Sequence, residues 1–370
     1  MTHALESQRL VDTFIELARI PSESGEEELF LDWLGRTFAN EFGANCHLDT
    51  YGNLVCKIAA KNSPNASPIL LCAHGDTVSP GKDIQPQIEH GTITSAGETI
   101  LAADDKAGIA EIMEALRRAD THPPVEVVVT RQEEVGLLGS KNLETDSLEA
   151  TTGFVVDGFE LDTIVTGWPS CIALDIHVVG ETAHPGIEPE KGISAIRVAA
   201  KAIAALREGR VEKDTTVSFG TFRGGQVRNA VPKEVVIEAE CRSLDHDRAL
   251  QQAEKIRRKF QSEAGKAGAS VEVQARVDYK AAHIPSNHRA VQLAKTALTS
   301  VGLSPVVSSS MGGADAVNLN AKGIFSVVLG YGGRNVHSTN ETIEIAAMEK
   351  ATEIIHSILM LSARAETRSA

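Results

Sequence analysis

Four short clusters of acidic residues and histidine, and one late histidine, carry side chains that commonly bind metal ions. Each of the four closes or follows an apolar run typical of a buried strand; they are His74-Gly-Asp76, Asp104-Asp105-Lys106, Glu133-Glu134 and Asp157-Gly-Phe-Glu160. His337 lies far downstream. Five separate segments could therefore bring carboxylate oxygens and imidazole nitrogens to one point. This pattern predicts a two-metal site that activates water for hydrolysis.

The first two clusters also have plainer explanations when each is taken alone. His74 could offer a neutral ring nitrogen to a metal while Asp76 orients the ring, but a polar turn after a strand would look the same. Asp104 precedes a predicted helix, where a carboxylate commonly caps the first turn. Beside another strand-end aspartate, however, the two oxygens of Asp104 could bridge two cations about 3.5 Å apart.

The pair Glu133-Glu134 is the most informative cluster, because neighbouring side chains after a strand point in different directions. One glutamate can bind metal while the other takes a proton from the attacking water. The alternative is a solvated pair at the start of a helix, since Gly136 follows. Asp157 is a further strand-end carboxylate, which alone would be explained as a turn or cap residue.

Two histidines need separate interpretations. His184 precedes Pro185 and could donate a hydrogen bond to a developing oxyanion, or it could simply be a polar turn residue. His337 lies in a polar segment with no apolar face, which favours a role as a ligand. The sequence has no GxSxG elbow, Walker loop or GxGxxG motif, which argues against a serine nucleophile of that type and against nucleotide binding.

The clusters lie in a segment where apolar runs alternate with helical periodicity. Predicted strands cover 53–58, 68–73, 125–129 and 153–156, and predicted helices cover 11–18, 29–34 and 106–118. Continuous apolar runs indicate central strands covered on both faces. Because the polar clusters follow strand ends, we expect them to meet at the carboxyl edge of an α/β sheet.

The pattern changes near residue 167. A strand, a helix, two strands, a helix and a final strand follow in ferredoxin-like order, at 172–179, 193–206, 215–220, 235–241, 245–260 and 271–277. The α/β pattern then resumes with a helix from Arg289 and a strand at 324–329, and His337 lies in this part. We therefore predict an α/β catalytic domain, with a mostly parallel mixed sheet flanked by helices, formed by 1–167 and 282–370. An α+β unit is inserted at 168–281.

Composition limits the partners. The 370 residues include 36 basic and 50 acidic ones, and the formal charge of −14 disfavours phosphate backbones and anionic surfaces, so we expect no nucleic-acid and no membrane partner. The five cysteines form no CxxC pair and are expected to be buried thiols in a reducing compartment. The absence of a signal-peptide pattern and of a bilayer-length apolar stretch predicts a cytoplasmic protein.

A family resemblance follows from seven motifs taken together. They are His74-Gly-Asp76-Thr77-Val78, Ala103-Asp104-Asp105-Lys106-Ala107-Gly108, Glu133-Glu134-Val-Gly136, Val156-Asp157-Gly158, Ala183-His184-Pro185-Gly186, Gly312-Gly313-Ala314-Asp315 and His337. Each is ordinary alone, but their order and spacing resemble the dizinc exopeptidase family that contains peptidase T, carboxypeptidase G and aminoacylase. The amino-acid sequences of the Asp104 and His184 motifs are most similar to those of peptidase T-like members.

The resemblance implies a ligand set for two Zn²⁺ ions per subunit, with Co²⁺ or Mn²⁺ as possible substitutes. His74, Asp104 and Asp157 would hold one ion. Asp104, Glu134 and His337 would hold the other, so that Asp104 bridges the two. Glu133 would be the general base and later the general acid, and Asp76 would orient His74. The family also tends to have a cis peptide bond at the position of Asp104-Asp105.

The resemblance also implies that the inserted unit is a lid and dimerisation domain on a zinc-exopeptidase fold. His184 resembles the lid histidine that reaches the site of the partner subunit in a homodimer. Asn229 and Arg242 resemble lid positions that contact substrate, and Gly312 and Gly313 resemble a loop that lines the substrate pocket.

The activity implied is hydrolysis of a peptide bond in a small peptide by a dizinc-activated water, as in a tripeptide aminopeptidase. An amidohydrolase, deacylase or carboxypeptidase acting on N-acyl amino acids stays open, because the chain is shorter than peptidase T and shows no evident signature for a free α-amino group. A non-catalytic binding protein on the same fold is the third alternative. The presence of every ligand position argues against it.

Overall fold

The computed structural model describes residues 2–364. The chain forms two compact units, of which the first combines Met1–Thr166, His283–Ser309 and Gly313–Ala370, and the second combines Gly167–Ala282 with Ser310–Gly312. Within residues 2–364, no helix is sufficiently long and apolar to cross a membrane.

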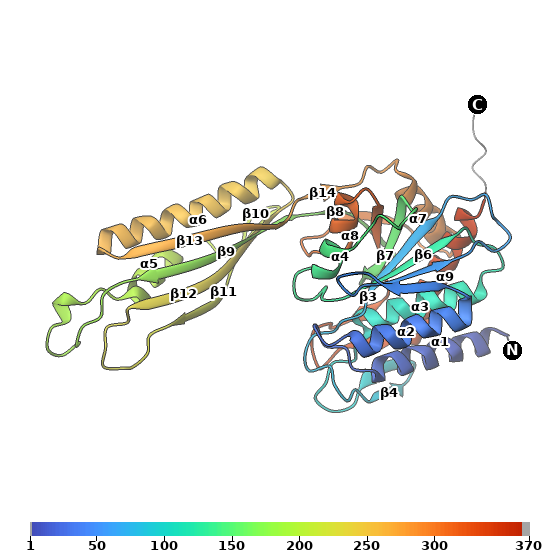
Figure 1. The fold of residues 1–370 in the computed structure, drawn as a ribbon, viewed down its shortest axis with the longest axis horizontal. Coiled ribbons are helices and arrows are strands. Elements are labelled where there is room, and N and C mark those ends of the chain that lie inside the picture. The colour runs from blue at the N-terminus through green and yellow to red at the C-terminus, as the bar shows by residue number, and fades with distance from the viewer. Residues whose placement is uncertain (1, 365–370) are drawn as a thin grey trace. The chain divides into compact units, whose positions relative to one another are not determined.

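The first unit is built on a nine-stranded mixed sheet (Figure 1). Its main path, in spatial order, is β1 (Asn45–Leu48), β2 (Leu54–Ile58), β6 (Val125–Thr130), β3 (Ile69–His74), β7 (Thr152–Gly158), β16 (Phe325–Gly330), β8 (Thr163–Trp168) and β14 (Ala282–His283), with β15 (Val306–Ser309) paired to β8. The four central strands run parallel, and the flanking pairs β1–β2, β2–β6 and β16–β8 are antiparallel. The predicted fold class is therefore confirmed.

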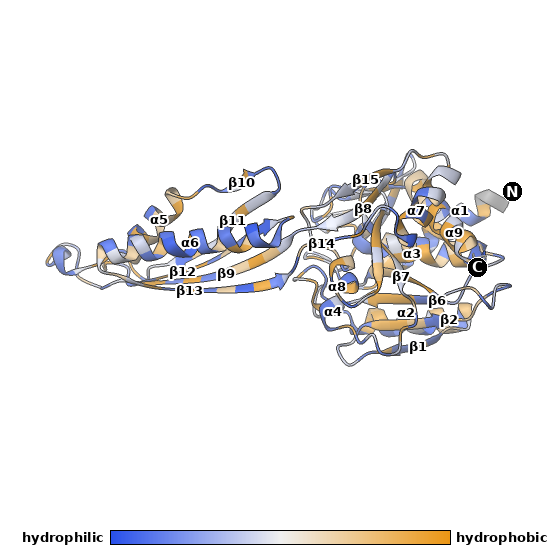
Figure 2. Ribbon diagram, turned by 90° about the horizontal axis from the view of Figure 1, so that it is seen from above, coloured by the Kyte–Doolittle hydropathy of each residue, from blue (hydrophilic) through white to orange (hydrophobic). Residues whose placement is uncertain are grey.

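The central strands are apolar because both faces of the sheet are covered. Every residue of β3 and β6 is buried, and Figure 2 shows the central strands in the colour of apolar residues. The helices of this unit are α1 (Thr2–Arg19), α2 (Glu28–Phe42), α3 (Ala103–Arg118), α4 (Leu138–Asn142), α7 (Arg289–Ser300), α8 (Ala316–Ala321) and α9 (Ile345–Ser362). Helix α3 packs against β3 and β7, and also against α1 and α9.

A small second sheet of the first unit lies outside the sequence predictions. Its strands, in spatial order, are β17 (Gly333–Arg334), β18 (Thr342–Glu344), β5 (Thr92–Ser95) and β4 (Pro86–Glu89). They are only two to four residues long, too short for a periodic pattern. Strand β18 pairs with β5, so the segment that follows His337 is joined to the segment that precedes Asp104.

The second unit has the predicted ferredoxin-like order with one additional short strand, β10 (Gly209–Glu212), between the first helix and the two predicted strands. Its elements are β9 (Ser170–Val179), η1 (Pro189–Lys191), α5 (Ala195–Ala204), β10 (Gly209–Glu212), β11 (Thr215–Gly224), β12 (Glu234–Ser243), α6 (His246–Ala267) and β13 (Ser270–Tyr279). The sheet order is β10-β11-β12-β9-β13, with all neighbours antiparallel. One face packs on α5 and α6 through an apolar cluster that includes Ile176, Ile237 and Phe260.

Two expectations need correction. Residues 310–312 belong to the second unit, although the sequence assigned them to the second part of the catalytic domain. The expectation that all cysteines are free thiols is wrong, because Cys46 and Cys56 face each other across β1 and β2 and form a disulfide. Cys72, Cys171 and Cys241 are buried free thiols, as expected.

Candidate metal centre

The predicted ligands meet because three parallel strands end at the same edge of the sheet. His74 is the last residue of β3, Glu133 and Glu134 follow β6, and Asp157 is the penultimate residue of β7. Asp104 lies at the beginning of α3, where its backbone is still extended, and its peptide bond to Asp105 is cis, as the resemblance implied.

Asp104 lies between the two histidines. Its Oδ1 is 3.2 Å from His74 Nε2, and its Oδ2 is 3.3 Å from His337 Nε2. Asp157 Oδ1 lies 4.0 Å from His74 Nε2, and Glu134 Oε1 lies 2.9 Å from His337 Nε2. The five proposed ligands thus form two groups that share Asp104, one carboxylate oxygen facing each group.

The charges at this centre strongly affect the pKa values of the two histidines. Hydrogen bonds with Asp104 and Glu134 raise the pKa of His337 to about 10. Burial alone would lower the pKa of His74, but its contacts with Asp104 and Asp76 outweigh burial and raise that pKa well above its usual value. Burial would raise the pKa of Asp104, but the two histidines lower it to about 2.

The remaining acids show what this centre is suited to hold. Burial, together with neighbouring negative charges, raises the pKa of Glu133 and Asp157 well above the usual values for carboxyl groups. In the described residues, the ion pairs of Asp104, Asp157 and Glu134 are all with histidines. Buried carboxylates and imidazoles without a lysine or arginine partner fit divalent cations, which neutralise several acids at once.

Asp76 supports both His74 and the glutamate pair. The His74 ring donates from Nδ1 to the backbone oxygen of Asp76 at 2.9 Å, which leaves Nε2 facing Asp104. The Asp76 carboxylate accepts hydrogen bonds from the backbone N–H of Glu133 at 2.9 Å and of Glu134 at 3.2 Å, and from the Ser24 hydroxyl at 2.6 Å. Its contacts with the backbone of the glutamate pair were not anticipated from the sequence.

Glu341 is a residue of the centre that the sequence analysis missed. This buried carboxylate accepts hydrogen bonds from the backbone N–H of Leu101 at 2.7 Å, of Ala102 at 2.9 Å and of Asp104 at 3.0 Å. Ala102 has a φ of +61°, so the chain turns sharply just before Asp104. In the sequence, the only indication of this role was that Glu341 lies four residues after His337. That spacing alone could not distinguish Glu341 from a solvated acid.

Asp105 was not among the predicted ligands, yet it lies in the same cluster of side chains. His74, Asp105 and Asp157 each place a ligand atom within 4.8 Å of the others, as do His74, Asp104 and Glu134. Asp105 Oδ2, however, accepts a hydrogen bond from the His74 backbone N–H at 3.2 Å. We therefore assign Asp105 to the support of His74 and keep Asp104 as the bridging candidate.

The predicted lid residues belong to the second unit. His184 is exposed and accepts a hydrogen bond at Nδ1 from the Gly186 N–H, and Asn229 is exposed between β11 and β12. Arg242, on β12, donates from Nε and Nη2 to Glu240 at 2.8 and 3.0 Å and from Nη1 to the Met311 carbonyl. Gly312 also lies in this unit, whereas Gly313 lies in the first. Their roles toward substrate stay predictions.

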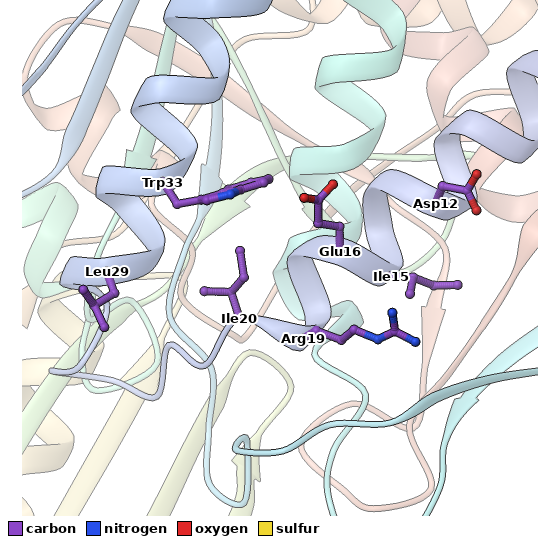
Figure 3. Close-up of a pocket in the computed structure, with 7 residues that line it drawn as sticks. All are labelled: Asp12, Ile15, Glu16, Arg19, Ile20, Leu29 and Trp33. Atoms are coloured by element: carbon purple, nitrogen blue, oxygen red, sulfur yellow. The ribbon is translucent and has the colours of Figure 1, made fainter.

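A separate hollow of about 650 Å³ lies between α1 and α2. It is lined by Asp12, Ile15, Glu16, Arg19, Ile20, Leu29 and Trp33, and Figure 3 shows these side chains on the two helices and, for Ile20, directly after α1. None of them is a histidine, and none belongs to the clustered ligands. The hollow is therefore not the metal centre.

A carboxylate that faces two histidine-containing ligand groups, at the carboxyl edge of an α/β sheet, is typical of metal-dependent hydrolases. The chain belongs to peptidase family M20/M25/M40, whose family description matches residues 70–361. It is a metal-dependent peptidase, and the predicted family resemblance is confirmed.

Relatives match almost the whole chain. A tripeptidase from Staphylococcus aureus is 34% identical, with a TM-score of 0.91 and coverage of 97% of this chain and 99% of that one. Aminopeptidase PepT from Bacillus cereus is 35% identical, with a TM-score of 0.87 and the same coverage. The uncharacterized protein YqjE of Bacillus subtilis is 34% identical over 97% of this chain and 100% of its own length.

Proposed function

We propose that the protein is an aminopeptidase of short peptides, with tripeptides as its main substrates. The observation that carries this proposal is the meeting of four further ligand side chains around Asp104, beside a glutamate with a raised pKa. The names of the tripeptidase and of aminopeptidase PepT, each similar over 97% of this chain, support the substrate class.

We assign the metal ligands in two sets. His74, Asp104 and Asp157 hold one divalent ion, and Asp104, Glu134 and His337 hold the other. One imidazole and two carboxylates per ion suit Zn²⁺, and Co²⁺ or Mn²⁺ would also accept this mixture of nitrogen and oxygen ligands. When bound, such ions polarise the scissile carbonyl and lower the pKa of the attacking water.

A side chain of the protein, that of Glu133, transfers the proton during hydrolysis. Glu133 takes it from the attacking water and returns it to the leaving amine. Its raised pKa, caused mainly by burial, makes the carboxylate a stronger base for the first step than an exposed glutamate would be, and the group then holds the proton until the second step. Asp76 fixes the backbone of Glu133 by accepting a hydrogen bond from its N–H. We assign oxyanion stabilisation to His184, and contacts with the substrate to Asn229, Arg242, Gly312 and Gly313.

Matched free and acylated substrates test this function. We expect metal-loaded protein to hydrolyse Leu-Gly-Gly with a kcat/KM at least about tenfold above that for N-acetyl-Leu-Gly-Gly, because an aminopeptidase site must accept a free α-amino group. Liberated leucine is measured by chromatography after reconstitution with Zn²⁺, Co²⁺ or Mn²⁺. A preference for the acetylated peptide would contradict the proposal and favour a deacylase or carboxypeptidase.

We also propose a homodimer, formed through the free edge of β13 in the second unit. Among residues 2–364, β9 is the only strand that pairs with β13, which lies at the end of its sheet. Two antiparallel copies centred on Gln274 would place Glu272 of each copy opposite Arg276 of the other, and Val271 opposite Val277. Beside this edge, Leu250, Val273 and Val277 line an apolar hollow of about 340 Å³. Opposite charges in a cross-strand pair favour this register.

A charge exchange tests the dimer. Arg276→Glu should convert dimers to monomers in sedimentation velocity, because it places two like charges opposite each other at both ends of the pair. Adding Glu272→Arg should restore the dimer. Arg36→Glu, at an exposed position of α2 in the first unit, is the control and should leave the mass unchanged. Dimers that persist in Arg276→Glu would contradict the proposed β13 register.

A further inference from the structure

Two large apolar side chains are exposed immediately beside the ligands. Phe159, two residues after Asp157, is 48% exposed, and Val135, next to Glu134, is 53% exposed. Val135 lies at the tip of a turn, because the N–H groups of Gly136 and Leu137 both donate to the Glu133 carbonyl. Leaving such side chains in water is unfavourable, so their position at the rim of a polar site calls for a partner.

Phe159 is held in place by its neighbours. Its ring meets Tyr331 edge to face, with 6.3 Å between ring centroids and an interplanar angle of 76°. The Tyr331 N–H donates to the Gly158 carbonyl at 2.8 Å. A side chain at Gly330 would lie 2.3 Å from the Glu160 carbonyl oxygen, so this glycine allows the two segments to approach closely. The segment carrying Phe159 is thus fixed on β16.

Tyr331 links this ring to the metal centre. The residue is fully buried, and burial together with the charges of Asp104 and Asp105 raises the pKa of its hydroxyl well above the usual value. The same tyrosine thus contacts the Phe159 ring and is affected by the charges of the carboxylates. The carboxylate of Glu160, the next residue in the chain, is paired with Arg334, which offsets its negative charge.

We propose that Phe159 and Val135 form an apolar subsite for the side chain of the substrate residue that supplies the scissile carbonyl. This inference rests on the proposed function and adds a substrate class, short peptides with an apolar N-terminal residue. The scissile carbonyl must lie at the ligands, and the Cα atom of that residue is bonded directly to the carbonyl carbon. Its side chain is therefore the one that meets residues flanking Glu134 and Asp157.

Peptides that differ only in the position of leucine test the subsite. For metal-loaded wild type, kcat/KM for Leu-Gly-Gly should exceed that for Gly-Gly-Gly and for Gly-Leu-Gly by roughly tenfold or more. Phe159→Ser should lower kcat/KM for Leu-Gly-Gly by roughly tenfold and should reduce its advantage over Gly-Gly-Gly to about twofold. Val135→Ser should act in the same direction, and Phe159→Leu, which stays apolar, should retain most of the preference.

Phe325 provides a matched control. It is 44% exposed and begins β16, at the opposite end of that strand from the segment joined to Phe159. Phe325→Ser should leave the leucine preference unchanged, and thermal unfolding verifies that each variant is folded. Turnover by Phe159→Ser with an undiminished leucine preference would overturn the subsite alone. Absence of turnover by metal-loaded wild type on every free peptide would overturn the proposed function and the subsite together.

Discussion

Replacing Glu133 by alanine is expected to lower kcat by about 10²- to 10⁴-fold while the protein keeps its full metal content. Glu134 Oε1 lies 2.9 Å from His337 Nε2, whereas in the described residues the Glu133 carboxylate makes no hydrogen bond with either histidine of the centre. Glu133 is nevertheless close enough to His74 and Asp157 for their charges to affect its pKa. Glu133 thus has a carboxylate that lies near the proposed metal ligands without being one of them. Such a position suits proton transfer.

The neighbouring glutamate is the control for this prediction. Glu134→Ala should lose metal, because it removes one of the side chains assigned to the second ion. Metal content is measured by mass spectrometry after dialysis, and kcat is measured with excess metal in the assay. Loss of metal in Glu133→Ala with normal content in Glu134→Ala would mean that the two roles are exchanged.

Much of the centre could be predicted because its ligands follow strongly apolar strands. β3 and β6 are buried along their whole length, so their sequences show them plainly, and parallel neighbours end at one edge. His74, Glu134 and Asp157 therefore meet where strand order places them. The assignment of Asp104 as the shared ligand and of His337 to the second ion came through the family's motif order, because Asp104 alone could equally cap a helix and no strand was predicted directly before His337.

Other features depend on contacts that a linear pattern does not show. Cys46 and Cys56 are ten residues apart, and only the register of β1 and β2 brings them face to face. Residues 310–312 join the second unit although both flanking segments belong to the first. In the sequence, Glu341 looks like any acidic residue of a polar loop. Its role is visible only in the fold, where backbone N–H groups at the start of α3 donate hydrogen bonds to it.

Glu341→Ala is expected to weaken metal binding about 10- to 100-fold, the usual effect of removing a group that supports a ligand. The substitution leaves the N–H groups of Leu101, Ala102 and Asp104 without their carboxylate acceptor. Each buried donor without a partner costs about 1–3 kcal/mol, so the free energy of unfolding should also fall by at least about 2 kcal/mol. The turn at Ala102 would relax and displace Asp104, the residue that we propose as the ligand shared by both ions.

The measurement must separate this positioning role from a general loss of stability. Zinc affinity is measured by competition with a chelator, and stability by urea unfolding with the metal removed. Glu341→Gln keeps one carbonyl oxygen as an acceptor and should retain an intermediate affinity. Glu344→Ala, at an exposed residue of the same segment, should change neither quantity. If Glu341→Ala lost stability but bound zinc as tightly as wild type, Glu341 would support the fold without positioning Asp104.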